Sequence, residues 1–146
     1  MSLWKQPADL ARLNGWSANT MMETLGIRIT AVGDDWLTGS MPVDQRTHQP
    51  YGLLHGGASV ALAETLGSTA AMLTLDPEKE LAVGLDINAN HIRGVRSGTV
   101  TGTAKALHIG RTTQVWEIRI ENEEGALVCI SRITMAVIPA RGMGVR

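Results

Sequence analysis

The chain has 146 residues, of which 44% are hydrophobic, and a formal net charge of −1. These values suit one domain with a sizeable core, and the near-neutral charge argues against nucleic acid as a partner. The lone Cys129 excludes an intrachain disulfide and a cysteine metal cluster, and the absence of a leader-like or membrane-spanning apolar run predicts a cytoplasmic protein with no membrane partner.

The first part of the chain predicts two short helices, a hairpin and a loop. Capping residues and periodicity favour the helices, and alternation of apolar and polar residues then favours two strands. A segment rich in Pro, Gly, Gln and His follows and predicts a loop. The expected ranges are 9–14 and 21–25 for the helices, 27–32 and 36–41 for the strands, and 42–54 for the loop.

Residues 55–75 predict one long helix, because they are mostly Ala, Leu and small hydroxyl residues with no helix breaker. At about 100° per residue, Leu62, Leu66 and Leu73 share one face. The opposite face is also small and apolar, with Glu64 at its middle, which indicates burial against a sheet on one side and against another surface, such as a second copy of the chain, on the other. From the helix alone, two interpretations of Glu64 are equally good. It is either a carboxylate at the surface or paired with a basic group, or a general base or nucleophile that faces a cleft.

The remaining chain alternates apolar and polar residues in four stretches separated by short turns. Strands are expected over residues 81–93, 99–108, 113–121 and 127–138, the first with Val83, Leu85, Ile87, Ala89 and His91 on one face. Six antiparallel strands and one long helix predict an α+β domain in which the sheet wraps the helix. We assign residues 1–138 to this domain and residues 139–146 to a C-terminal tail without periodicity.

The loop that ends in His55, Gly56 and Gly57 enters the long helix and predicts an oxyanion site. The first amides of a helix lack intrahelical partners, the helix dipole adds partial positive charge, and glycines leave room for a ligand. This geometry suits a carbonyl oxygen that gains negative charge, although the same pattern also marks an ordinary helix entry. Glu64 lies two turns along the helix, too far to reach that oxygen, so it could face the equivalent loop of another subunit.

Three segments in unbroken order, residues 41–68, 85–93 and 106–111, resemble the hotdog-fold acyl-CoA thioesterases. The nearest groups are the 1,4-dihydroxy-2-naphthoyl-CoA thioesterases of menaquinone synthesis and the proofreading thioesterases of enterobactin synthesis, within the phenylacetate-type thioesterase superfamily. The resemblance implies a hotdog fold, in which a curved antiparallel sheet wraps the long helix. It also implies a homodimer joined edge to edge with interface active sites, a homotetramer made of two dimers, and an acyl-CoA or acyl-carrier-protein thioester as substrate.

The resemblance also assigns roles to individual residues. Glu64 matches the catalytic carboxylate, as general base or nucleophile, and Gly56 matches the residue whose amide polarises the thioester carbonyl. Gln49 and His55 match polar residues near the thioester, and Ser68 matches a hydroxyl that positions water or substrate. The residues matched to contacts with the substrate and coenzyme A are Gly84, His91, Ile92, Arg93, Gly94, His108, Ile109, Gly110, Arg111 and Thr112. Thioester hydrolysis needs an activated water and an oxyanion donor, so we expect no metal and no redox cofactor.

Several alternatives stay open. Arg93 and Arg111 are candidates for binding the phosphates of coenzyme A, but they also fit solvated surface charges, and His91 also fits a core histidine. The leading function is hydrolysis of aromatic or related acyl thioesters. Its rivals are a non-catalytic acyl-CoA or acyl-carrier binding module and a hotdog dehydratase that uses His55.

Overall fold

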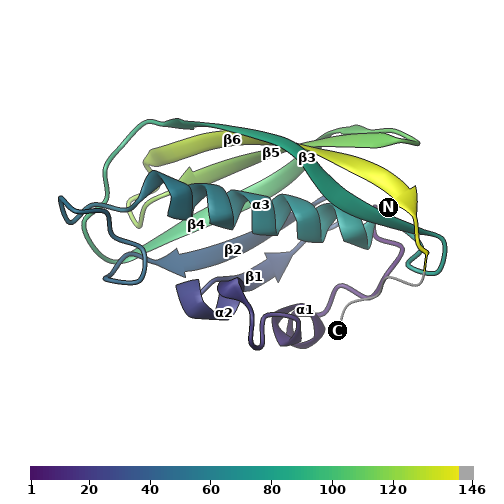
Figure 1. Cartoon of the computed structure of the whole chain (residues 1–146), viewed down its shortest axis with the longest axis horizontal. Coiled ribbons are helices and arrows are strands. Elements are labelled where there is room, and N and C mark those ends of the chain that lie inside the picture. Colours follow the sequence, from purple (N-terminus) through teal and green to yellow (C-terminus); the bar gives the residue numbers. More distant parts are fainter. Residues whose placement is uncertain (142–146) are drawn as a thin grey trace.

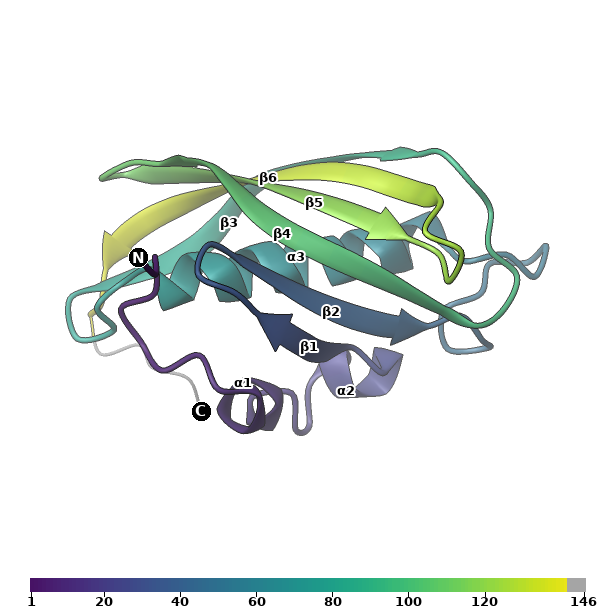
Figure 2. The same cartoon turned by 180° about the vertical axis from the view of Figure 1, so that it is seen from behind.

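The computed structural model describes residues 1–141 as a curved six-stranded antiparallel sheet around one long helix (Figures 1 and 2). The elements are α1 (Leu10–Gly15), α2 (Met21–Leu25), β1 (Arg28–Val32), β2 (Trp36–Pro42), α3 (Gly56–Leu73), β3 (Glu80–His91), β4 (Thr99–Ile109), β5 (Thr113–Glu121) and β6 (Leu127–Pro139). The predicted α+β class is confirmed. Each predicted helix and strand is present, with ends that differ by at most two residues.

The order of the strands across the sheet differs from their order in the chain. Across the sheet the order is β1-β2-β4-β5-β6-β3. β3 pairs antiparallel with β6 at one edge, and residues 92–98 cross from this edge to β4 in the middle of the sheet (Figure 1). The predicted short turn between β3 and β4 is therefore wrong, because a glycine-containing segment marks the end of a strand and does not specify its neighbour. Within residues 1–141, the second side of β3 carries no strand.

The leucine face of α3 packs on the sheet, where small residues let the two layers approach closely. Leu62, Leu66 and Leu73 are fully buried, as predicted. Leu66 lies over Gly39 of β2 and Gly102 of β4, and a Cβ on these glycines would lie 2.5 and 2.7 Å from its methyl groups. A larger residue at either strand position would therefore push the helix away from the sheet.

The N-terminal segment closes the C-terminal end of α3. Gln6 Nε2 donates to the backbone oxygens of Met72 at 2.7 Å and Leu75 at 3.0 Å, which satisfies carbonyls near the end of the helix. Trp4 stacks on the buried Trp116, with ring centroids 6.3 Å apart. The segment before α1 is therefore part of the packed structure.

A β-bulge in β3 changes the face on which its first residues lie. Leu85 is the extra residue between the paired Gly84 and Asp86, so the alternation shifts by one position at this point. Ile87 shares the α3-facing side of Gly84, whereas Val83 does not. The prediction of one common face is therefore wrong for Val83 and Leu85, which are exposed apolar residues. The alternation of apolar and polar residues in the sequence does not indicate the bulge.

The C-terminal end of the described chain lies beside the start of β3. β6 ends at Pro139, which pairs with Glu80, and the Ala140 N–H donates to the Lys79 oxygen at 2.9 Å. Residues 142–146 of the predicted tail lie outside the described residues. In the part of the chain that the structure describes, no helix has the length and apolar character needed to cross a membrane.

Candidate active site

The N-terminus of α3 opens onto a cavity of about 310 Å³. The cavity is lined by Gln49, Leu53, Leu54, Gly56, Ser59, His91, Ile92, Arg93, Gly94 and Val128. The loop before α3 supplies one wall, and the end of β3 with the segment after it supplies another. Predicted site residues from two distant parts of the sequence therefore lie together at the first turn of the helix.

His91 lies directly against Gly56. A Cβ on Gly56 would lie 2.8 Å from His91 Nε2, so the imidazole occupies the space that the missing side chain leaves. His91 is exposed, which contradicts the alternative of a core histidine. The backbone N–H groups of Ile92 and Arg93 donate to the Val128 oxygen at 2.8 and 3.3 Å. These bonds hold the predicted substrate-binding segment beside the first turn of α3.

His55 is the N-cap of α3, and this role determines its tautomer. Its Nδ1 accepts a hydrogen bond from the Gly57 N–H at 2.8 Å, so Nδ1 carries no proton. In the neutral ring the proton is then on Nε2, which makes this atom a hydrogen-bond donor. The His55 side chain also borders a groove of about 310 Å³ beside Met21 and Leu25 of α2.

Gln49 is held within the loop that precedes α3. Its side-chain oxygen accepts a hydrogen bond from the Tyr51 N–H, and its own backbone N–H donates to the Leu53 oxygen at 2.8 Å. Because the side-chain oxygen is used inside the loop, the side-chain NH₂ group is the part of Gln49 that can bind a carbonyl oxygen.

Glu64 lies beside β3, at the free edge of the sheet. A Cβ on Gly84 would lie 2.8 Å from Glu64 Oε1. The residue is exposed, so this chain alone does not provide the low-polarity surroundings that the helix pattern predicts. Glu64 follows Gly56 by eight residues, about 12 Å along the helix axis, so one thioester group cannot contact both residues of the same chain. Ser68, one turn further, donates to Met135 Sδ at 3.8 Å rather than to Glu64.

The second group of predicted substrate contacts, residues 108–112, lies near the other end of α3. β4 ends at Ile109, which pairs with Gln114, and Gln114 Nε2 donates to Thr74 Oγ1 at 2.8 Å just beyond the helix. α3 has 18 residues and is therefore about 27 Å long, which separates this group from the cavity at the helix N-terminus. Within a single chain the two groups of predicted contacts therefore do not border the same cavity.

Four residues of the cavity, Leu53, Leu54, Ser59 and Val128, are not among the predicted site residues. Ser59 is buried and lies one turn after Gly56 on α3, so helical spacing is a signal that could have identified it. The pairing of β3 with β6 places Val128 at the cavity, and no local sequence pattern indicates this pairing. Among the described residues, no three His, Cys, Asp or Glu are grouped so as to hold a metal ion.

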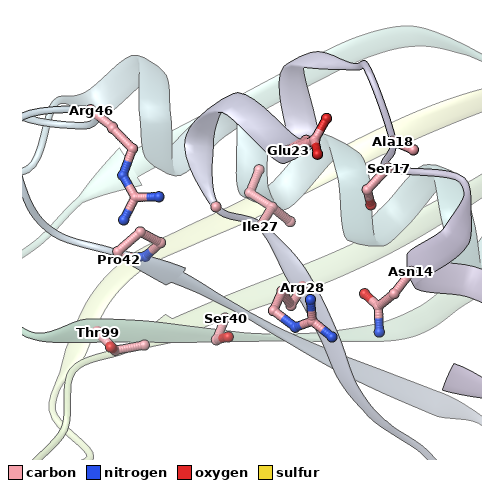
Figure 3. A pocket seen from close by; sticks show the side chains of 11 residues that line it. Asn14, Ser17, Ala18, Glu23, Ile27, Arg28, Ser40, Pro42, Arg46 and Thr99 are labelled. Atoms are coloured by element: carbon pink, nitrogen blue, oxygen red, sulfur yellow. The ribbon is translucent and has the colours of Figure 1, made fainter. Parts of the chain in front are cut away.

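A separate cavity of about 450 Å³ lies where the α1–α2 region meets β1 and β2 (Figure 3). Arg28 and Ser40 line it from the sheet and Glu23 from α2. Arg46, on its far side, donates from Nη2 to Asp44 Oδ2 at 2.7 Å, and this hydrogen bond holds the pKa of Asp44 at about 2. None of the predicted site residues lines this cavity, so it is not part of the candidate active site.

Comparisons with known proteins agree with this architecture. The family model described as the thioesterase superfamily matches residues 51–129. The 1,4-dihydroxy-2-naphthoyl-CoA hydrolase of Escherichia coli is 50% identical over 93% of this chain and 99% of its own length. The proofreading thioesterase EntH of Cronobacter sakazakii is 52% identical over 93% of this chain and 98% of its own. The crystal structure of a mutant of thioesterase PA1618 from Pseudomonas aeruginosa superposes with a TM-score of 0.93 at 56% identity, covering 94% of this chain and 99% of that one.

Proposed function

The chain belongs to the thioesterase superfamily, and on this premise we propose that it hydrolyses aromatic or related acyl-CoA thioesters with Glu64 as the catalytic carboxylate. It is a hotdog-fold acyl-CoA thioesterase, with the sheet wrapped around α3 as in the solved thioesterase structures. The naphthoyl group named for the Escherichia coli relative supports an aromatic acyl group, in keeping with a role in menaquinone synthesis.

The observation that carries this proposal is the first-turn amide of Gly56 beside a cavity that also contains Gln49 and His91. A thioester oxygen placed at this turn accepts a hydrogen bond from the Gly56 N–H. The helix dipole stabilises the negative charge that the oxygen gains during attack. The Gln49 NH₂ group is a further donor in the same cavity, whereas the His55 side chain borders the separate groove beside α2.

Glu64 acts on the water molecule that attacks the thioester carbon. The carboxylate accepts a proton from the water as the new C–O bond forms, and the carbonyl electron pair moves onto the oxygen bound by Gly56. When that pair returns, the C–S bond breaks, and the thiolate of coenzyme A takes the proton from Glu64. Ser68 positions the water or the substrate. A nucleophilic route, in which Glu64 attacks and water hydrolyses the resulting anhydride, gives the same two products.

Two chains are needed to complete such a site, because Glu64 and Gly56 of one chain lie too far apart. The exposed Val83 and Leu85 lie on β3, whose second side carries no strand within the described residues. Pairing of two β3 strands edge to edge and antiparallel would extend the sheet and bring the N-terminal end of one α3 toward the C-terminal end of the other. This arrangement supports a homodimer with interface active sites, and two such dimers would form the homotetramer.

The same arrangement gives residues 108–112 a place in the site. The end of β3 in one chain would approach the end of β4 in the other, so that both groups of predicted contacts border the substrate. Arg93 and Arg111 are exposed and would then bind the phosphates of coenzyme A or of the phosphopantetheine arm of a carrier protein.

The two alternatives predict different chemistry. A non-catalytic binding module would bind benzoyl-CoA without releasing free thiol. A dehydratase that uses His55 as a base needs an unprotonated nitrogen facing the substrate, and Nδ1 is already used as the helix cap. This bond favours hydrolysis over dehydration.

Glu64→Gln is the test of the proposed function. We expect turnover of benzoyl-CoA, followed with a thiol-reactive dye, to fall about 10²–10⁴-fold, because the amide cannot accept the proton. Glu124→Gln, in the exposed turn between β5 and β6, is the matched control and should keep the wild-type rate. Full activity in the Glu64→Gln variant would remove Glu64 from the mechanism. If the wild-type protein binds benzoyl-CoA without releasing thiol, the binding module is favoured.

A further inference from the structure

We propose that Gly84 is a positioning residue for the catalytic carboxylate, because the carboxylate of Glu64 lies in the space that a side chain at position 84 would fill. The inference rests on the proposed role of Glu64 and adds a second role to the substrate contact expected at Gly84. β3 runs alongside α3 (Figure 1). This brings Glu64 and Gly84 together, although the second half of α3 and the segment that connects it to β3 separate them in the chain.

The surroundings of Gly84 point to Glu64 alone. A Cβ built on Gly84 would lie 2.8 Å from Glu64 Oε1, whereas the next atoms are Glu64 Cδ at 3.9 Å and Ile133 Cδ1 at 4.0 Å. Backbone conformation does not require glycine here, since the described glycines with positive φ are Gly26, Gly52, Gly98 and Gly125. Space for the carboxylate is therefore the physical reason for glycine at position 84.

The strand pair around Gly84 positions more than one group of the site. Gly84 pairs with the buried Met135 of β6, and Met135 Sδ accepts the hydrogen bond from Ser68 Oγ. The bulge at Leu85 follows directly, and bulges commonly adjust the geometry of a strand beside an active site. One short stretch of β3 and β6 thus supports both Glu64 and Ser68.

The consequence of adding a methyl group can be estimated from the distance. Ordinary contact begins at 3.4 Å, so a Cβ at 2.8 Å from Oε1 requires a displacement of about 0.6 Å. Oε1 is the end of a flexible side chain, so the carboxylate can move without unfolding the protein. A misplacement of about 1 Å at a reacting group can reduce the rate about 10²-fold.

Gly84→Ala, with Gly15→Ala as the matched control, tests this inference. A Cβ on Gly15 would have no neighbour within 4 Å, so the control adds the same methyl group in open space. For benzoyl-CoA we expect kcat of Gly84→Ala to fall at least about tenfold while KM changes less than about threefold, with an unchanged thermal midpoint and oligomeric state. A wild-type kcat in Gly84→Ala overturns the proposal. A lowered thermal midpoint or loss of the dimer in this variant also overturns it, since neighbours other than Glu64 would then occupy the space beside residue 84.

A double variant separates positioning from general damage. Glu64→Asp shortens the side chain by one methylene, so its carboxylate no longer reaches the new methyl group. We expect Glu64→Asp combined with Gly84→Ala to be as active as Glu64→Asp alone, and multiplicative losses would overturn the proposal. If Glu64→Gln keeps full activity, the proposed function itself fails. If Glu64→Gln is inactive while Gly84→Ala has the wild-type kcat, the failure is confined to this inference.

Discussion

At the scale of single residues, the first turn of α3 separates the helix cap from the oxyanion donor. His55 caps the helix by accepting the Gly57 N–H, which leaves the Gly56 N–H without a partner inside the helix. The Gly56 N–H is therefore the backbone donor of the proposed oxyanion site, and a substitution can delete it while the cap residue stays in place.

Gly56→Pro removes this N–H, and we expect kcat to fall about 10²–10³-fold. Gly56 is the first residue of α3, a position where proline fits, and the φ of −66° and ψ of 131° at His55 are compatible with a following proline. Gly56→Ala is the matched control, because it places a Cβ against His91 and keeps the N–H. Steady-state kinetics with benzoyl-CoA compare the two variants, and equal losses would assign the effect to crowding of His91.

At the scale of elements, α3 packs closely on β6 at Gly67, where a Cβ would lie 2.5 Å from Ile133 Cγ2. Gly67→Ala gains about 1 kcal/mol of helix propensity but overpacks a buried contact at a cost of about 1–3 kcal/mol. Because Ile133 is fully buried and cannot move aside, overpacking should win by about 1 kcal/mol. Urea unfolding measures the loss, with Gly15→Ala as control. Ile133→Ala removes Cγ2, so the double variant should lose less than the sum, and additive losses would contradict the contact.

The ends of the elements are predictable from the sequence because local groups determine them. Asp9 and Thr20 cap α1 and α2 with their side chains, and Gly26 ends α2 with a positive φ of 73°. The position of β3 in the sheet and the bulge at Leu85 are not predictable in this way. Both depend on the hydrogen bonds of β3 with β6, a strand that lies far along the chain.

At the scale of the whole molecule, the residues of the candidate site are predictable but their arrangement is not. Helix periodicity and the family pattern select Glu64 and Gly56, yet they do not place His91 against Gly56 or Glu64 over Gly84. These contacts arise from the approach of α3 to β3, which is determined by packing of the whole sheet. The same packing separates residues 108–112 from the α3 N-terminus, so the site must be completed between chains if all these residues take part.

Mixed dimers test that assembly directly. Glu64→Gln lacks the carboxylate and Gly56→Pro lacks the amide, so each homodimer should be nearly inactive. If the carboxylate of one chain acts on a thioester held by the other, a mixed dimer has one intact site and one site with both defects. Random exchange gives half mixed dimers, so activity should recover to about a quarter of wild type. The measurement is thiol release from benzoyl-CoA after co-refolding equal amounts of both variants, with each variant refolded alone as control. Recovery is impossible if both groups act within one chain, so a mixture as inactive as its components would contradict the shared site.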